Sequence, residues 1–341
     1  MAGFRLFDLN PEQQKAVLST DGPLLILAGA GTGKTRVITC RVAYMIAEGV
    51  DPANILAVTF TNKAANEMRE RLAGMVEKEK ATKVLMSTFH ALCVRILRAG
   101  IEHLGYKKNF SIYDEGDQLG LIKKIITRTA ASDEKLDPHL AKNLISKAKN
   151  NGWREPGPGE EKTLAGAVFA RYQADLKTLN AVDFDDLLLL AVQLLEEHEV
   201  VRDHWRRRFR YIMVDEFQDT NRLQLRLITL LADERQNVAV VGDDDQSIYG
   251  WRGAEVSNIL EFETHFPNPT VVKLEQNYRS TNAILQTANI LIRNTTVLSR
   301  NIAIGSACFG GIYNVSMVGG RIGDDEGSSP WAYKIKTHVP Y

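Results

Sequence analysis

Cysteine is scarce in this chain, and the few that occur are far apart. The 341 residues contain three cysteines, Cys40, Cys93 and Cys308, and none of them forms a CxxC pair. Disulfide frameworks and cysteine zinc sites need paired or clustered cysteines, so this usage argues against both. We expect buried thiols in a reducing compartment.

The chain also lacks a long apolar run. The longest one, Leu187–Leu195, is interrupted by Gln193 and is too short to span a bilayer. The first residues contain no apolar core of the kind that signal peptides carry. We therefore expect a cytoplasmic protein with no membrane partner.

Neither sign of charge dominates the composition. Lysine plus arginine and aspartate plus glutamate each total 42 residues, so the formal net charge is zero. A neutral chain has no global field that attracts nucleic acid, so a nucleic-acid binder of this composition must gather its basic residues in a groove. The hydrophobic fraction of 44% is that of an ordinary globular protein, and the length allows about two or three domains.

Short β-branched or apolar runs alternate with segments of helical periodicity. We expect strands at Leu24–Ala28, Ile55–Phe60, Val84–Phe89, Tyr211–Glu216, Val238–Asp243 and Thr270–Glu275. Apolar runs of this length, alternating with helices, predict an α/β fold with a parallel sheet covered on both faces. Open sheets of this kind bind ligands at the carboxyl ends of their strands, and the motifs of this chain lie there.

Two stretches differ from this alternation. Between Phe89 and Arg210 helical segments dominate and strand signals are almost missing, which predicts a helical domain inserted between the third and fourth strands. From about Thr295 the chain is rich in glycine and has no helical periodicity. That second stretch is compatible with a poorly ordered tail or with one or two marginal strands.

A glycine-rich segment, AGAGTGKT at Ala28–Thr35, lies between the first predicted strand and a helix. Its glycines allow backbone N–H groups to turn toward phosphate oxygens, and the helix offers its N-terminus to the anion. Lys34 is expected to reach the β- and γ-phosphates of a nucleotide, and the Thr35 hydroxyl is expected to bind Mg²⁺. A simple glycine-rich turn is the alternative, and the order of strand, loop and helix disfavours it.

A second motif, VDEFQDT, ends the fourth predicted strand with two acidic residues. We expect Asp215 to hold Mg²⁺ directly or through water, and Glu216 to orient and deprotonate the attacking water. An acidic strand end on the surface is common, and it is the pairing with the phosphate loop that favours catalysis. Asp219 has no assignment from its spacing, and a helix cap is one interpretation.

Polar and aromatic residues follow the fifth predicted strand. Gln246 can hydrogen-bond both a γ-phosphate and its attacking water. Tyr249 and Trp251 share a turn with Arg252, and exposed rings beside arginine suit stacking on unpaired bases, worth about 1–3 kcal/mol per base. Isolated aromatic residues more often fill a core. Here the flanking glycines and polar residues favour exposure.

Three further residues are candidates for nucleotide contacts. Tyr278 can stack on a purine ring, and Arg279 can act on a γ-phosphate. Gln13 can read the adenine edge, because its amide both donates and accepts hydrogen bonds. Taken alone, Gln13 would more often be a solvated helix residue.

In this order the blocks resemble those of the superfamily 1A DNA helicases of the UvrD, Rep and PcrA family. The resemblance runs from about Leu9 to about Asn294 and rests on LNPEQQKAV, AGAGTGKT, AVTFTNKAANEM, STFHALCVRIL, VDEFQDT, VGDDDQSIYGWRGA and LEQNYRST. It implies a RecA-like P-loop NTPase domain at 1–89 and 207–280, interrupted by a helical domain at 90–206. Residues 281–341 would be the start of a second lobe followed by a glycine-rich tail that does not match.

The resemblance also implies ATP and Mg²⁺ as ligands. Gln13 would recognise adenine, Arg36 and Tyr278 would flank its ring, and Arg279 would touch the γ-phosphate. The implied ATP-binding residues are Gln13, Ala28, Gly29, Ala30, Gly31, Thr32, Gly33, Lys34, Thr35, Arg36 and Tyr278. The implied catalytic residues are Lys34, Asp215, Glu216, Gln246 and Arg279, with Thr35 and Asp215 at the metal.

Single-stranded DNA and junctions between single- and double-stranded DNA are the implied partners, with self-association or other repair and replication proteins left open. The implied DNA-binding residues are Phe60, Asn62, Thr88, His90, Tyr249, Trp251 and Arg252. The family translocates 3′ to 5′ along single strands and unwinds duplex DNA. The implied function is therefore that of an ATP-dependent 3′–5′ DNA helicase.

Family members continue into a second RecA-like lobe that supplies another arginine finger. We find neither of that lobe's motifs after Arg300. Because removing an arginine finger costs about 10³–10⁵ in rate, we expect this chain alone to turn over ATP weakly or not at all and not to unwind processively. The alternative is a non-catalytic nucleotide- or DNA-binding module that a separate chain completes.

Overall fold

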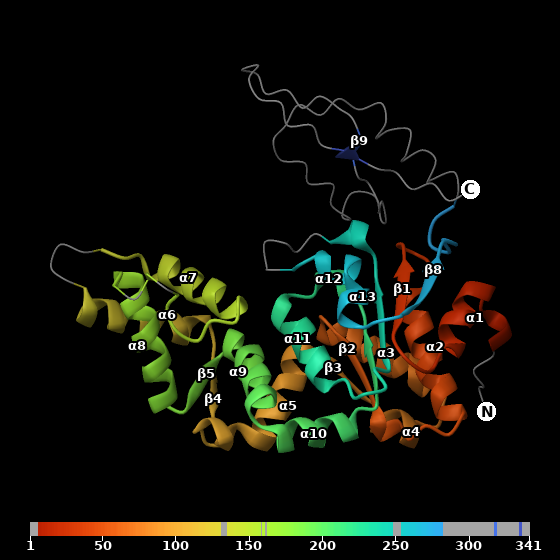
Figure 1. Cartoon of the computed structure of the whole chain (residues 1–341), viewed down its shortest axis with the longest axis horizontal. Coiled ribbons are helices and arrows are strands. Elements are labelled where there is room, and N and C mark those ends of the chain that lie inside the picture. The colour runs from red at the N-terminus through yellow and green to blue at the C-terminus, as the bar shows by residue number, and fades with distance from the viewer. Residues whose placement is uncertain are drawn as a thin grey trace.

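The computed structural model of the chain describes residues 6–130, 135–157, 159–160, 162–247 and 254–281, and two short strands at 317–318 and 334–335. Within these ranges strands and helices alternate along the chain, and the fold is α/β as predicted. Figure 1 shows the sheet on one side of the molecule and a helical part on the other.

The sheet has six parallel strands. Their order across the sheet is β3 (Leu85–Thr88), β2 (Ile55–Thr59), β6 (Tyr211–Val214), β7 (Val238–Gly242), β1 (Leu24–Ala28) and β8 (Thr270–Leu274). In register, Leu24 of β1 lies opposite Ala239 on one side and Thr270 on the other. All the predicted strands of the sheet are thus confirmed. Because they are parallel, their carboxyl ends lie along one edge.

Side chains alternate between the two faces of the sheet, and each face has its own core. In β2, Leu56 and Val58 enter one core, whereas Ile55 and Ala57 enter the other. Each of these residues is at most 1% exposed. Burial on both faces explains why the strands read as continuous apolar runs.

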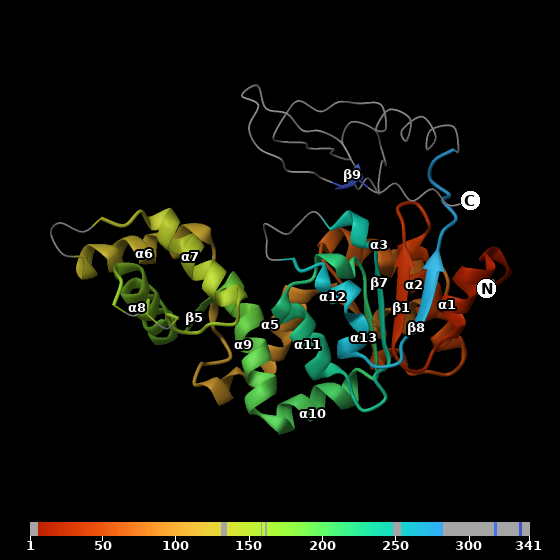
Figure 2. The same ribbon diagram turned by 45° about the horizontal axis from the view of Figure 1, so that its top comes forward.

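Helices cover both faces. The core on one face is shared by α1 (Pro11–Leu18), α2 (Lys34–Ala47), α3 (Asn62–Ala73) and α4 (Lys78–Lys83). The other core is shared by α5 (Phe89–Gly100), α9 (Phe184–Glu197), α10 (Glu199–Arg208), α11 (Arg222–Leu231), α12 (Ser257–Leu260) and α13 (Phe262–His265). Figure 2 shows β1 and β8 side by side near α1 and α2.

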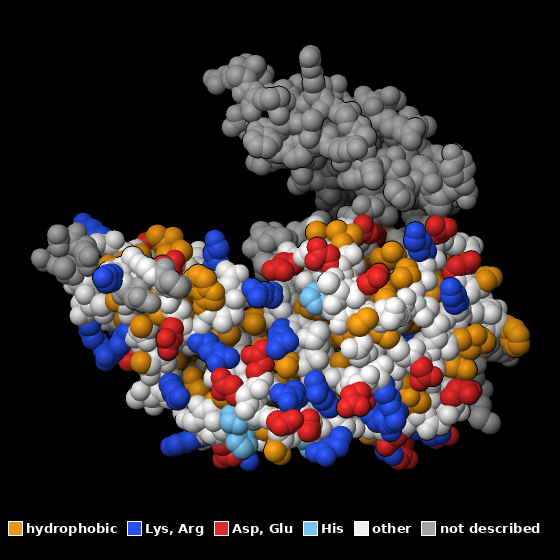
Figure 3. Space-filling model, viewed as in Figure 1, with side chains coloured by type: hydrophobic (Ala, Val, Ile, Leu, Met, Phe, Trp, Pro, Cys, Tyr) orange, Lys and Arg blue, Asp and Glu red, His pale blue; other side chains and the backbone are white. Residues whose placement is uncertain are grey.

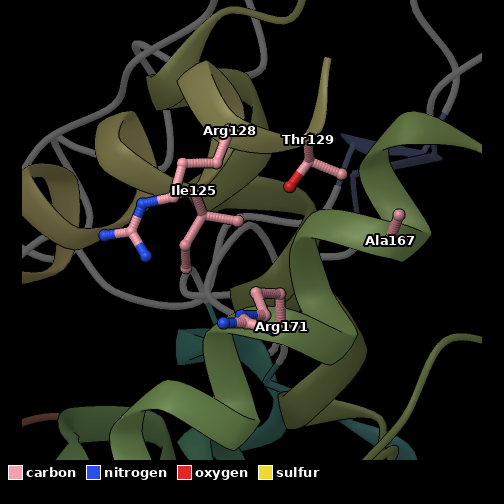
Figure 4. A pocket seen from close by; sticks show the side chains of 5 residues that line it. All are labelled: Ile125, Arg128, Thr129, Ala167 and Arg171. Atoms are coloured by element: carbon pink, nitrogen blue, oxygen red, sulfur yellow. The ribbon is translucent and has the colours of Figure 1, made fainter. Parts of the chain in front are cut away.

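A separate helical part is built from α6 (Glu115–Thr129), α7 (Pro138–Asn150) and α8 (Leu164–Thr178). It has its own core, which includes Ile122, Ile145 and Tyr172. A hollow of about 350 Å³ lies between α6 and α8 and is lined by Ile125, Arg128, Thr129, Ala167 and Arg171. Figure 4 shows these side chains from close by. This hollow belongs to the helical part and contains none of the predicted site residues.

Two three-residue strands, β4 (Ser111–Tyr113) and β5 (Ala181–Asp183), pair in parallel beside this helical part. From the sequence we expect almost no strand here, and three residues are too few to show a period of two. The segment 90–206 contributes both to the sheet and to the helical part. Its helices α5, α9 and α10 pack on the sheet, whereas α6, α7 and α8 have their own core. The domain boundaries near 89 and 207 stay a prediction.

Several helices begin at a reciprocal cap. The side chains of Asn10, Asp114, Asp183 and Asn221 each accept the N–H of the third helical residue, whose own side chain accepts the N–H of the cap. Such boxes satisfy two backbone donors that a helix start would otherwise leave unpaired. Short 3₁₀ turns at Leu6–Asp8, Pro52–Asn54, Ile101–Leu104, Phe217–Asp219 and Asp244–Gln246 complete the connections.

After Thr281 the structure describes one antiparallel pair, β9 (Met317–Val318) and β10 (Lys334–Ile335). The rest of the predicted segment 281–341 lies outside the described residues. Among the described helices, none combines the length and apolarity that crossing a bilayer requires. Figure 3 shows basic and acidic side chains interspersed over one face of the molecule, in keeping with the zero net charge.

Candidate functional site

The loop between β1 and α2 is shaped by glycine. Gly31 and Gly33 have φ angles of 74° and 90°, in the left-handed region that strains residues with a side chain. A Cβ on Gly31 would lie 2.7 Å from the Cβ of Arg279, and one on Gly33 would lie 3.1 Å from Nε2 of Gln13. The predicted phosphate loop is therefore enclosed by two segments that are distant in sequence.

The first turn of α2 is open to an anion. Its N-cap is Gly33, and no side chain in the described part of the chain caps it. The first N–H groups of such a helix have no internal partner and attract negative charge. The Thr32 hydroxyl donates to the carbonyl of Gly29 at 2.6 Å and closes the loop on itself.

The three predicted catalytic motifs meet at the side chain of Lys34. Its Nζ lies 3.1 Å from Oε2 of Glu216 and 3.3 Å from Oε1 of Gln246. These residues follow β1, β6 and β7, which are consecutive in the sheet. Strand order thus brings together residues that are about 200 positions apart, with separations of 182 and 212.

Asp215 directly follows β6, next to Glu216, and is 3% exposed. Its carboxylate accepts a hydrogen bond from the Thr35 hydroxyl and, at 3.1 Å, from the backbone N–H of Glu216. Burial, together with the charge of Glu216, raises the pKa of Asp215 to about 7. A nearby cation would favour the ionised form of Asp215. The oxygens of Asp215 and Thr35 therefore suit Mg²⁺.

Glu216 is held in an uncommon backbone conformation, with φ 52° and ψ 44°. Nε2 of Gln218 donates to Oε2 of Glu216 at 2.9 Å, and Oε1 of Gln218 accepts the N–H of Asp243 at 3.1 Å. Gln246 in turn donates to Oδ2 of Asp243. Gln218 and Asp243 therefore tie the second motif to the third, a role that their spacing did not indicate.

Asp219 is not a helix cap. The cap of α11 is Asn221, whose side chain accepts the N–H of Gln224 at 2.9 Å. Burial and the charge of Glu216 raise the pKa of Asp219 to about 7. Its Oδ1 is buried and has no hydrogen-bond partner among the described residues. Asp219 thus belongs to the acidic cluster at the end of β6.

Gln13 is 1% exposed, so its interpretation as a solvated helix residue is wrong. Its Oε1 accepts the N–H of Asn10 at 3.2 Å, and its Nε2 donates to the carbonyl of Thr32 at 2.9 Å. The amide thus fixes α1 against the phosphate loop. Its role at adenine stays a prediction.

The other two residues predicted beside the base lie on the same rim. Tyr278 is 54% exposed, and its hydroxyl accepts from Nδ2 of Asn10 at 2.9 Å and donates to Oε1 of Gln276 at 2.9 Å. Arg36 donates to the carbonyl of Asp8 at 3.0 Å. Their contacts with a base stay predictions.

The predicted DNA contacts that the structure describes lie at the carboxyl ends of β2 and β3. Phe60 packs edge-on against Phe89, with ring centroids 5.6 Å apart. Asn62 is exposed and is the first residue of α3, whereas the Thr88 hydroxyl caps α5 by accepting the N–H of Ala91 at 3.3 Å. Tyr249, Trp251 and Arg252 lie outside the described residues.

His90 stacks on Phe184, the first residue of α9. The ring centroids are 4.0 Å apart, and Phe184 is 54% exposed. Burial lowers the pKa of His90 to about 4, so the ring is neutral near pH 7. The sequence offers no periodic signal for Phe184, because the contact joins α5 to a helix that is far along the chain.

Comparison with known proteins agrees with this geometry. Residues 9–267 match the family model described as the UvrD/REP helicase N-terminal domain. The chain is 49% identical over 300 residues to the ATP-dependent DNA helicase PcrA of Bacillus subtilis (strain 168), a match that covers 85% of this chain and 40% of that protein.

Other relatives give the same result. The ATP-dependent DNA helicase PcrA of Staphylococcus aureus (strain Mu50 / ATCC 700699) is 46% identical over 294 residues, which is 84% of this chain and 40% of that protein. The protein of the same name from Leuconostoc citreum is 46% identical over 292 residues, covering 84% and 39%. The chain thus spans about 40% of the length of these relatives. The matches confirm the resemblance seen in the motifs.

Proposed function

This chain belongs to the UvrD/REP helicase N-terminal domain family, and from that premise we propose that it is the ATP- and single-stranded-DNA-binding part of an ATP-dependent 3′–5′ DNA helicase. The observation that carries the proposal is the meeting of three motifs at Lys34, whose Nζ contacts both Glu216 and Gln246. The names of the relatives support an ATP-driven reaction on DNA.

The loop fits the phosphates of ATP. Gly31 and Gly33 leave the backbone accessible, the N-terminus of α2 has no side-chain cap, and the Lys34 side chain is 10% exposed. A partly buried ammonium beside free N–H groups stabilises a polyanion more strongly than an exposed one does. We assign adenine recognition to Gln13, Arg36 and Tyr278.

The residues at the end of β6 fit Mg²⁺. This ion usually takes one or two carboxylates together with waters and substrate phosphates. Thr35 and Asp215 supply such a partial set, and the described residues contain no group of three or more His, Cys, Asp and Glu that could hold a metal unaided. When bound with ATP, Mg²⁺ neutralises charge on the phosphates.

The other residues of the site have separate tasks in ATP hydrolysis. Glu216 orients a water and accepts its proton, as a positioned carboxylate can. Gln218 donates to Glu216 and holds its carboxylate in place when Lys34 turns to phosphate. Gln246 contacts the same ammonium, and Arg279 stabilises charge on the γ-phosphate.

We assign single-stranded DNA to the half of the strand edge that carries Phe60, Asn62, Thr88 and His90. Stacking on Tyr249 and Trp251 beside Arg252 is part of the same assignment. Unpaired bases stack on exposed rings without sequence preference, as a translocating protein requires. Junctions of single- and double-stranded DNA, other copies of the chain, repair or replication proteins, and a cytoplasmic location belong to the proposal as well.

Isothermal titration of the purified chain with Mg–ATP tests the nucleotide site. The Lys34→Ala variant should bind about 10- to 100-fold more weakly, because hydrogen bonds to charged groups contribute about 1.5–3 kcal/mol. Lys123→Ala, at an exposed lysine of α6, is the control and should bind as the wild type does. Equal binding by Lys34→Ala and the wild type would refute the assignment of the loop.

A further inference from the structure

The segment after β8 folds back onto the phosphate loop. β8 lies beside β1 in the sheet, so both segments leave the same edge at adjacent positions, with Leu274 opposite Ala28. The N–H of Tyr278 donates to the carbonyl of Gly31 at 2.8 Å. Nδ2 of Asn277 donates to the carbonyl of Ala30, also at 2.8 Å.

The other end of the Asn277 amide shapes its own turn. Oδ1 of Asn277 accepts the N–H groups of Arg279 at 2.8 Å and Ser280 at 2.9 Å. A short amide that binds backbone two and three residues ahead forms an Asx-type turn. One side chain thus fixes the backbone of Arg279 and also reaches across to the loop.

Little free space separates the two segments. A Cβ on Gly31 would lie 2.7 Å from the Cβ of Arg279 and 2.9 Å from Oδ1 of Asn277. Residue 31 therefore has no space for a side chain, and the hydrogen bonds from Asn277 and Tyr278 tie the turn to the loop. The position of the Arg279 backbone relative to the loop is therefore set at this junction.

We propose that Asn277 is a positioning residue that fixes Arg279 against the phosphate loop, so that the site distinguishes a nucleoside triphosphate from a diphosphate. This inference rests on the proposed function, since it requires that the loop bind nucleotide. Asparagine suits the task because its amide both donates and accepts. Aspartate would keep the acceptor for the turn and lose the donor to Ala30.

The Asp variant therefore separates the two tasks of the side chain. Asn277→Asp keeps the turn and breaks the tie to Ala30. Asn10→Asp is the matched control, because Asn10 lies on the same rim, donates to the Tyr278 hydroxyl at 2.9 Å and keeps its capping oxygen as aspartate. Both variants add the same charge near the site.

Titration of each variant with Mg–ADP and with a non-hydrolysable Mg–ATP analogue measures the preference for triphosphate. Asn277→Asp should lower this preference roughly tenfold, the scale of one hydrogen bond to a charged group. Asn10→Asp should weaken both ligands by the same factor. In a double-mutant cycle, Asn277→Asp should add little to Arg279→Ala, because both changes remove the same interaction.

Some outcomes would refute this inference alone, and another would refute the proposed function as well. An unchanged preference in Asn277→Asp, or full additivity with Arg279→Ala, would overturn this inference alone. A wild type that binds neither nucleotide would overturn the proposed function as well. If Asn277→Asp does not fold by thermal melting, Asn277→Ser takes its place, because a serine hydroxyl can hold the turn and is too short to reach Ala30.

Discussion

Lys34 and Glu216 form an ion pair where β1 and β6 end. We expect phosphate to compete with Glu216 for the Lys34 ammonium. A phosphate offers Lys34 a more highly charged partner than a single carboxylate does. Glu216 would then lose one of its contacts, but the 2.9 Å hydrogen bond from Gln218 would remain. We therefore expect Gln218 to keep the carboxylate in position once nucleotide is bound.

Gly31→Ala is expected to disrupt the phosphate loop, and Gly22→Ala is its matched control. The two glycines have nearly equal φ angles, 74° and 75°, so the backbone strain of an alanine, about 1–2 kcal/mol, should be similar. A Cβ would meet Arg279 at Gly31 but nothing within 4 Å at Gly22. Urea unfolding should show a larger loss for Gly31→Ala, and only that variant should lose Mg–ATP affinity. Equal effects of the two changes on nucleotide affinity would contradict the enclosed loop.

The sequence alone assigns a role to some residues of the site and none to Gln218 and Asn277, although both lie inside the quoted motifs. Lys34, Glu216 and Gln246 were predicted from strand, loop and residue type, and the structure brings them together. Gln218 and Asn277 contact residues that follow other strands, Asp243 after β7 and Ala30 after β1. Spacing along the chain reports local geometry, so it cannot show which strand becomes a neighbour.

At the scale of elements, the junction of α7, α8 and α9 depends on a buried ion cluster. Nζ of Lys149 lies 2.6 Å from Oδ2 of Asp183 and 2.8 Å from Oδ1 of Asp186, and all three side chains are at most 2% exposed. The Tyr172 hydroxyl donates to Asp183 at 3.0 Å. Burial disfavours the ammonium, yet Asp186 and Asp183 raise the pKa of Lys149 above its ordinary value. The pairing therefore outweighs the desolvation.

Lys149→Met should destabilise the protein by about 3–5 kcal/mol, because it leaves two buried carboxylates without their cation. Lys142→Met is the control on the same helix. Lys142 pairs with the exposed Glu115, and surface pairs contribute about 0–1 kcal/mol. Urea denaturation followed by circular dichroism measures both. A loss below about 1 kcal/mol for Lys149→Met would show that the cluster contributes no more than a surface pair.

This cluster illustrates why some elements could not be predicted. Asp183 caps α9 and ends β5, and its buried cation comes from α7, 34 residues earlier. Nothing in the local pattern of Lys149 sets it apart from the other lysines of the same helix, Lys142 and Lys147. By contrast, the strands of the sheet are buried on both faces, so their apolar runs were recognisable.

At the scale of the whole molecule, one edge of the sheet carries two groups of residues. The ends of β6, β7, β1 and β8 hold the nucleotide motifs, and the ends of β2 and β3 hold the described residues assigned to DNA. The parallel fold predicted from the sequence requires a common edge, although it does not give the order of the strands. Because β2 lies beside β6, the two groups are neighbours, and the N–H of Asp215 donates to the carbonyl of Val58 at 2.9 Å.

The helical part joins this edge through Asn150 at the end of α7. Its Nδ2 donates to Asp185 at 2.9 Å, and its Oδ1 accepts from Nδ2 of Asn221 at 3.2 Å. Asn221 caps α11, directly after the motif that contains Glu216. The helical part is thus linked by hydrogen bonds to the segment that carries the acidic residues.

Steady-state ATP hydrolysis by the purified chain, with and without oligo-dT, tests the central claim most directly. We predict slow turnover that oligo-dT stimulates, that Lys34→Ala abolishes, and that Glu216→Gln lowers by about 10²–10⁴ while Mg–ATP still binds, since this is the usual contribution of a general base. Turnover unchanged in Glu216→Gln would contradict the assignment of the base. ATP binding without any turnover, with DNA or without it, would favour the alternative of a non-catalytic module that a separate chain completes.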